Sequence, residues 1–140
     1  MPAVMEMIRG LAAFEKAEDK VEIQAERLVE DGFGSNPAFH CVLACFGEEV
    51  AGFCLSWFRY STWRGRLLYV EDLYVKEKFR GKGAGTALLE AQYQIAQNLK
   101  IPFLHLQVLD WNTPAIEFYK KYDGQFDAEW LNVLLPVPPL

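Results

Sequence analysis

Histidine and cysteine are scarce in this chain, and neither is spaced for metal binding. The 140 residues include two histidines and three cysteines. Cys41, Cys45 and Cys54 match no metal-ligand spacing and cannot all pair, so we expect buried free thiols in a reducing compartment. No metal is therefore expected as a cofactor.

The sequence also lacks an excess of positive charge and a long apolar run. Its net charge is −5, which argues against nucleic-acid binding because phosphates need a basic surface. An acidic surface attracts small cations instead. No apolar run approaches the ~18 residues of a membrane span, and the N-terminus lacks the basic-then-apolar order of a signal peptide. These absences predict a cytoplasmic protein without a membrane partner.

What is present is the composition of a folded domain. Hydrophobic residues make up 51% of the chain and charged residues 24%, so the chain can bury a core. No repeat, low-complexity segment or linker interrupts it. Residues 1–140 are therefore predicted to form a single domain.

Hydrophobic periodicity and turn signals predict alternating helices and strands. Helices are expected at residues 2–17, 25–34, 86–99 and 112–122, and strands at 38–46, 50–61, 66–75, 102–110 and 125–135. This order predicts an α/β fold, a mixed sheet with helices on its faces.

The segment between the third strand and the third helix is rich in glycine and in basic residues. Gly81, Gly83 and Gly85 let backbone N–H groups approach a ligand, and the following helix presents its positive dipole end. Arg80 and Lys82 add countercharge, which predicts a phosphate site. A solvated surface turn is the alternative. A nucleotide binder is disfavoured, because the spacing fits neither the P-loop nor the dinucleotide fingerprint.

The loop "FRGKGAG", after a strand ending in "YVEDLYV", resembles the acetyl-CoA loop of the GNAT N-acetyltransferases. "DGFGSNPAFHC", "YSTWRGR" and "VLDWNTPAIEFYKKY" extend the resemblance to the diamine acetyltransferase branch, from about Leu11 to Trp130. The resemblance implies the GNAT acyl-CoA N-acyltransferase fold, with a mixed, mostly antiparallel sheet flanked by helices. It also implies direct acetyl transfer from acetyl-CoA to a primary amine of a small di- or polyamine or of a thialysine-like amino acid.

The resemblance assigns coenzyme A to the end of the third strand and to the loop after it. The implied positions are Leu73, Tyr74, Val75, Arg80, Gly81, Lys82, Gly83, Ala84, Gly85 and Thr86. Asn112 resembles a further coenzyme A contact, and it is also suited to cap the last helix.

Tyr119 is the candidate catalytic acid. It matches the tyrosine that the family places beside the coenzyme A sulfur, where a phenol can protonate the leaving thiolate. Periodicity alone favours a packing role, because Tyr119 shares a helix face with Phe118 and Tyr122.

Glu71 and Asp72 are the candidate carboxylates for the amine. Adjacent residues of a flat strand point to opposite faces, and the family's matching glutamate favours Glu71 as the catalytic and substrate-binding group. A β-bulge would let both carboxylates approach the substrate. The alternative for Glu71 is a solvent-facing strand charge.

The resemblance also implies substrate contacts near the first and last residues that it covers, Leu11 and Trp130. Phe14 and Glu15 match an aromatic–glutamate pair that touches the polyamine, although a solvated helix-end charge is nearly as good an interpretation of Glu15. Glu129 matches another substrate contact only if a gap is allowed.

The chain departs from its relatives at the N-terminus, where it starts directly at a helix, and we expect the usual first strand to be missing. The strand at residues 38–46 would then be a sheet edge, and exposed edges recruit other strands. We therefore expect a homodimer that covers this edge. A truncated, non-catalytic acyl-CoA-binding protein and a protein or peptide N-acetyltransferase remain the alternative functions.

Overall fold

A computed structural model describes residues 1–139 of the chain. The elements are α1 (Pro2–Phe14), α2 (Ala25–Phe33), β1 (His40–Phe46), β2 (Glu49–Ser61), β3 (Gly65–Val75), α3 (Ala84–Asn98), β4 (Leu104–Leu106) and α4 (Thr113–Lys120), with short 3₁₀ turns at Glu18–Lys20 and Glu77–Phe79. The structure divides into two compact units, Met1–Gln107 and Val108–Leu140.

The first unit is built on a sheet with the strand order β1-β2-β3-β4. β1 pairs antiparallel with β2, β2 pairs antiparallel with β3, and β4 runs parallel to β3. This confirms the mixed sheet predicted from the order of the elements, and the mostly antiparallel pairing that the family resemblance implies.

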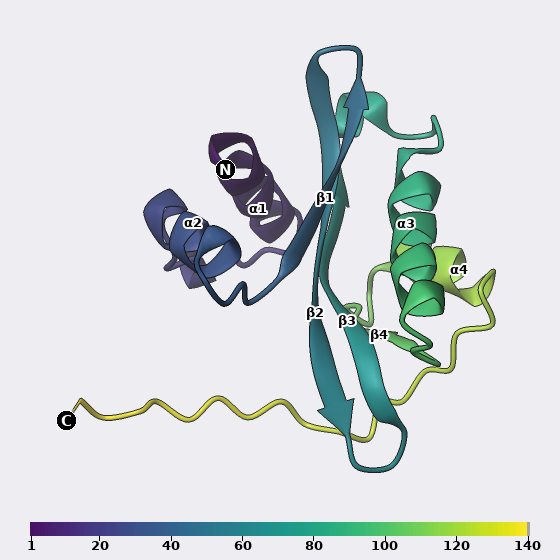
Figure 1. The fold of residues 1–140 in the computed structure, drawn as a ribbon. Helices are drawn as coiled ribbons and strands as arrows, with labels where there is room; N and C mark the ends of the chain where they lie inside the picture. The colour runs from purple at the N-terminus through teal and green to yellow at the C-terminus, as the bar shows by residue number, and fades with distance from the viewer. Residues whose placement is uncertain (140) are drawn as a thin grey trace. The chain divides into compact units, whose positions relative to one another are not determined.

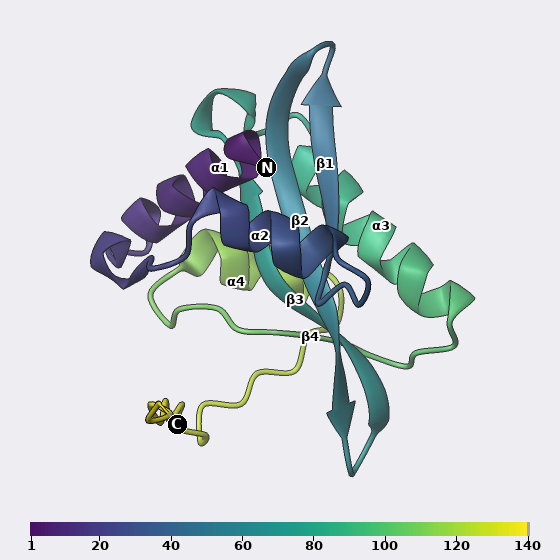
Figure 2. The same ribbon diagram turned by 60° about the vertical axis from the view of Figure 1, so that its left-hand side comes forward.

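Helices cover both faces of this sheet: α1 and α2 lie on one face and α3 on the other (Figures 1 and 2). Phe53 and Leu55 of β2 pack with α1, and Cys54 between them packs with Leu88 of α3. Side chains alternate between faces along a strand. Because helices cover both faces of β2, its sequence is a continuous apolar run and does not alternate between apolar and polar residues.

The close approach of α1 to β3 depends on Gly10. A Cβ atom at Gly10 would lie 2.8 Å from the hydroxyl oxygen of Tyr74, so a larger residue would require the Tyr74 side chain or α1 to shift. The absence of a side chain at Gly10 thus lets α1 and the Tyr74 ring of β3 lie close together.

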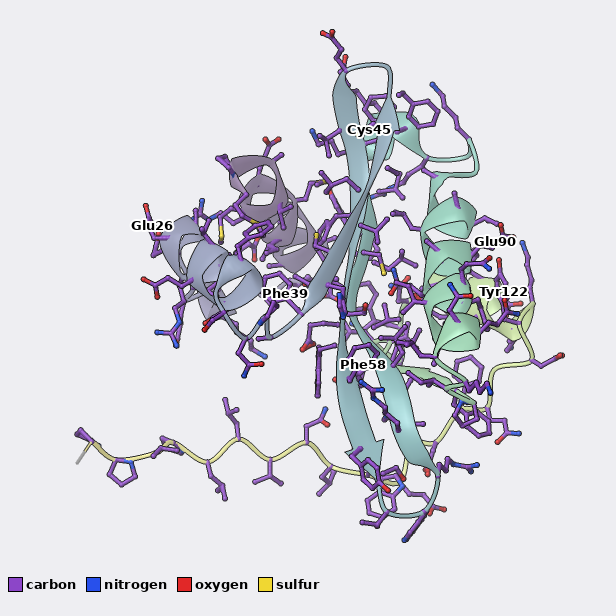
Figure 3. All side chains as sticks on the ribbon, viewed as in Figure 1. Glu26, Phe39, Cys45, Phe58, Glu90 and Tyr122 are labelled. Carbon is purple, nitrogen blue, oxygen red and sulfur yellow. The ribbon has the colours of Figure 1, made fainter. Side chains whose placement is uncertain are left out.

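β1 is the outer strand on its side of the sheet, as expected, and no strand among residues 1–139 pairs with its outer edge. The cysteines are free thiols. Cys54 is buried and Cys41 is half-buried, but Cys45 is exposed near the β1–β2 turn (Figure 3). The expectation that all the thiols are buried is therefore wrong for Cys45, because an edge strand shields its side chains less.

The strand predicted at residues 125–135 does not form. Residues 124–139 are neither helix nor strand, and Leu131 and Leu134 are 89% and 97% exposed. An apolar run becomes a strand only where another strand offers hydrogen-bond partners, which a local pattern does not show. β4 is likewise shorter than the predicted 102–110.

Candidate active site

A β-bulge at Glu71 interrupts the alternation of β3. Val70 pairs with Ser56 and Asp72 with Leu55, so Glu71 has no partner on β2. Leu55 faces α1, and cross-strand partners share a face. Asp72 therefore lies on the α1 face together with Glu71, as the sequence analysis allowed for a bulged strand.

Three carboxylates converge on this face. Burial raises the pKa of Asp72 to about 6, and the neighbouring charges of Glu71 and Glu15 add to the rise. Burial also raises the pKa of Glu15, which follows the last residue of α1. A helix C-terminus carries partial negative charge. The arrangement is suited to attract and hold a cation.

Trp57 orients Glu71. The indole Nε1–H of Trp57 donates to Oε1 of Glu71 at 3.4 Å, and the Trp57 ring lies 5.0 Å from the Tyr69 ring at a tilt of 43°. Sequence reasoning missed Trp57. The sequence does show that Trp57 lies two residues after Leu55 and therefore on the same face of the strand. Its contact with Glu71, however, follows only from the register of the hairpin.

Arg59 and His105 form a second polar pair on the same face. A nitrogen of the Arg59 guanidinium, Nη1, lies 2.7 Å from Nδ1 of His105, and the His105 ring meets Tyr69 edge-on at 5.0 Å. Burial, and then the charge of Arg59, lower the pKa of His105. A neutral His105 accepts this hydrogen bond through Nδ1. Arg59 was also missed, because it reads as an ordinary surface charge.

The outer edge of β3 is open beyond the bulge. β4 pairs only with the residues from Leu68 to Val70, so within the described chain no strand borders residues 71–75 on that side. Unpaired N–H and C=O groups of a sheet edge can bind an extended ligand. This edge leads directly into the glycine-rich loop.

The loop holds backbone conformations that favour glycine. Gly81 and Gly83 have φ values of +77° and +87°, and Gly83 precedes α3 without any side-chain cap. A Cβ atom at either position would meet nothing within 4 Å, so the space beside the backbone is open. Because the first N–H groups of a helix have no intrahelical partner, the start of α3, from Ala84 to Thr86, can bind an anion.

The two basic side chains of the loop are held near it. Nε of Arg80 donates to the Val75 carbonyl at 2.9 Å, and its guanidinium lies 5.8 Å from the centre of the Phe14 ring. The Lys82 ammonium lies 5.8 Å from the Phe79 ring. The structure thus brings Arg80 to the end of β3, where Leu73, Tyr74 and Val75 complete the strand.

The remaining predicted residues belong to the second unit. The Asn112 side chain caps α4 by accepting a hydrogen bond from the Ala115 N–H at 3.4 Å. Tyr119 is half-buried on α4, with its ring 5.3 Å from that of Phe118. Glu129 lies in exposed chain, where its N–H donates to Asp127 at 2.9 Å.

Within residues 1–139, no group of three or more His, Cys, Asp or Glu side chains is arranged to hold a metal ion. None of the helices described is both long and apolar enough to cross a membrane.

Comparison with known proteins identifies the family. The profile of the acetyltransferase (GNAT) family matches residues 5–124. The chain belongs to the GNAT family. This GNAT acetyltransferase is 44% identical to the mouse (Mus musculus) thialysine N-epsilon-acetyltransferase, over an alignment that covers 92% of the chain and 82% of the relative. It is 40% identical to the thialysine N-epsilon-acetyltransferase of Caenorhabditis elegans, with 86% and 74% covered.

Solved structures agree on the fold. An aminoglycoside acetyltransferase from an uncultured soil metagenomic sample, solved in complex with trehalose, superposes with a TM-score of 0.76 at 17% identity. The match covers 98% of this chain and 90% of that one. At this identity the likeness supports the shared architecture and leaves the substrate open.

Proposed function

We propose that this GNAT acetyltransferase transfers acetyl from acetyl-CoA to a primary amine of a small di- or polyamine or of a thialysine-like amino acid. The observation that carries the proposal is the bulge at Glu71. It gathers carboxylates on one face of β3, at the point where the outer edge of the strand becomes open toward the glycine-rich loop. The names of the two thialysine N-epsilon-acetyltransferases support the thialysine-like part of this substrate class.

The residues of the loop fit coenzyme A. We assign its pyrophosphate to the N–H groups from Gly81 to Thr86, with Arg80 and Lys82 as countercharge. The open edge at Leu73–Val75 would pair with its extended arm, and Asn112 would be a further contact. When bound, the cofactor supplies the acetyl thioester.

The carboxylates would have different roles toward the amine, one binding the ammonium ion and one accepting its proton. Glu71, oriented by Trp57, holds the ammonium ion, and Phe14, Glu15 and Glu129 are further proposed contacts. Asp72, whose pKa is raised to about 6, accepts the proton better than an ordinary carboxylate does. Because an alkylammonium has a pKa of about 10.4, the neutral amine is a minor species that forms as this proton leaves.

Tyr119 would complete the transfer. The amine nitrogen would bond to the carbonyl carbon of the thioester as the carbon–sulfur bond breaks, and the leaving thiolate would take the phenol proton of Tyr119. The nitrogen would then release its second proton to solvent, which is the one proton that each turnover yields. Solvent then reprotonates Tyr119 as Asp72 releases its proton.

Replacing Tyr119 by Phe keeps the ring and should lower kcat by roughly 10²–10⁴-fold, as expected for a general acid, with coenzyme A affinity little changed. If Tyr119→Phe is as active as the parent, Tyr119 is not the acid and serves only in packing.

A thiol-release assay with acetyl-CoA tests the function. The panel contains diamines, polyamines, thialysine, matched monoamines and peptides with a free N-terminus or lysine. We expect turnover with the small cationic amines and little with the monoamines. Coenzyme A binding without turnover would support a non-catalytic acyl-CoA-binding protein, and turnover with peptides alone would support a protein or peptide N-acetyltransferase.

We also propose a homodimer formed through β1. Leu43 and Phe46 of this strand are 45% and 41% exposed, and an apolar edge with unpaired backbone groups favours strand addition. Sedimentation at micromolar concentration should give a dimer that a charge at the edge, Leu43→Lys, weakens. A monodisperse parent monomer would contradict the proposal.

A further inference from the structure

The polar groups on the α1 face follow an order along the sheet. Asp72 lies across from Leu55, Trp57 across from Tyr69, and Arg59 across from Leu67. Two residues of strand, about 7 Å, separate Trp57, which contacts Glu71, from Arg59. The face is therefore acidic at the bulge and cationic farther from the loop.

This inference rests on the proposed function, under which the glycine-rich loop and the open edge of β3 would bring the thioester to the bulge from the side of the loop. The part of the substrate that does not react must then extend the other way, over Tyr69 and toward Arg59. In an amino acid with an amine at the end of its side chain, the distance from that amine to the α-carboxylate is comparable to the distance between Trp57 and Arg59.

Arg59 is suited to meet a carboxylate there. Its guanidinium reaches over β3 to His105 at 2.7 Å, which uses one of its N–H donors. Among the described residues, Arg59 has no carboxylate partner within ion-pair distance. A guanidinium binds carboxylates through paired donors in a fixed plane. The same charge repels the distal ammonium of a diamine.

We propose that Arg59, positioned by His105, binds the α-carboxylate of an amino acid substrate and so selects an amino acid with a side-chain amine over a di- or polyamine. Arg59 acts on specificity, and the acetyl transfer occurs at the bulge. His105 positions Arg59 by accepting one of its hydrogen bonds.

Substrates that differ only at the carboxyl group test the proposal. Thiol release is measured with thialysine, with its methyl ester, and with the diamine left when its carboxyl group is removed. The parent should prefer thialysine over the other two by about 10- to 100-fold in kcat/KM, the range of a charge-assisted hydrogen bond. Arg59→Gln should remove the preference by raising KM for thialysine while kcat stays near the parent value.

Arg66→Gln is the matched control. Its guanidinium lies 4.2 Å from the centre of the Phe58 ring, and Phe58 packs on the α3 side, so the same charge is lost from the opposite face. This variant should keep the preference for thialysine. Arg59→Lys should recover part of it, because the charge returns without the paired donors.

The outcomes separate the two proposals. If the parent acetylates the three amines equally well, or if Arg59→Gln slows all of them by one factor, the role of Arg59 is wrong while the proposed function stands. If the parent acetylates none of the three but does acetylate a polyamine, the role of Arg59 is wrong while the proposed function stands. If the parent acetylates neither these three amines nor any polyamine, the proposed function fails and this inference fails with it.

Discussion

The two halves of β3 differ although they belong to one strand. In the first half, Leu68 and Val70 are 0% and 3% exposed, and the backbone pairs with β2 and β4. In the second half, Glu71 is exposed, Asp72 is half-buried, and the outer edge has no strand beside it in the described chain. A single extra residue marks the boundary. One strand can thus anchor the core and present the site, because the bulge changes which face its side chains meet.

Deleting Glu71 should produce the largest effect on activity. Since Glu71 is the unpaired residue of the bulge, its deletion keeps the register on both sides and the protein should fold. The second half of β3 would lose the bulge and one carboxylate, so kcat/KM should fall by at least about 10²-fold. Glu71→Gln keeps the bulge and isolates the charge. A deletion variant as active as Glu71→Gln would show that the bulge itself contributes nothing.

Leu68→Ala tests the first half of β3. The side chain is fully buried against Ala96 and Ile101, so the free energy of unfolding should fall by about 2–5 kcal/mol. KM should not change while the protein is folded. The matched change Leu73→Ala lies in the second half, where Leu73 is half-buried. It should lower the free energy of unfolding, measured by urea denaturation, by less than Leu68→Ala does. Equal losses would remove the distinction between the halves.

Gly83→Val tests whether the loop after the second half binds coenzyme A. At a ligand concentration of 100 Kd, binding should stabilise the parent by about 2.7 kcal/mol. The variant should lose this protection in thermal melts. Gly65→Val is the control, because Gly65 also has a positive φ, +80°, with open space around it. Both variants carry backbone strain, so protection that survives in Gly83→Val would overturn the loop assignment.

Apart from the loss of the proposed proton acceptor, Asp72→Asn should have only a small effect on the fold, a gain in stability. The folded protein holds its proton up to a pKa of about 6, compared with 3.8 for the ordinary group. As pH rises between these values, the unfolded chain loses the proton first, so the free energy of unfolding of the parent falls. The variant escapes this penalty and should be more stable by about 1–3 kcal/mol above pH 7. Near pH 3 the two proteins should be equally stable, and a constant difference across the pH range would contradict the account.

Residues adjacent in the sequence were easier to predict than residues joined by the sheet. The loop from Arg80 to Gly85 was recognisable because its glycines, its charges and the following helix are neighbours along the chain. Trp57 and Arg59 were missed because their significance depends on the register that places them beside Glu71 and His105.

The sequence by itself determined the family, the order of the main helices and strands, and the glycine-rich loop, because these depend on local periodicity and on motifs within short stretches. Only the tertiary structure decided that Glu71 is the extra residue of a bulge, that the pKa of Asp72 is raised to about 6, and that residues 125–135 form no strand. Each of these depends on which distant backbone or charge lies opposite a residue. Strand pairing and burial set that relation, and the pattern of one segment does not contain it.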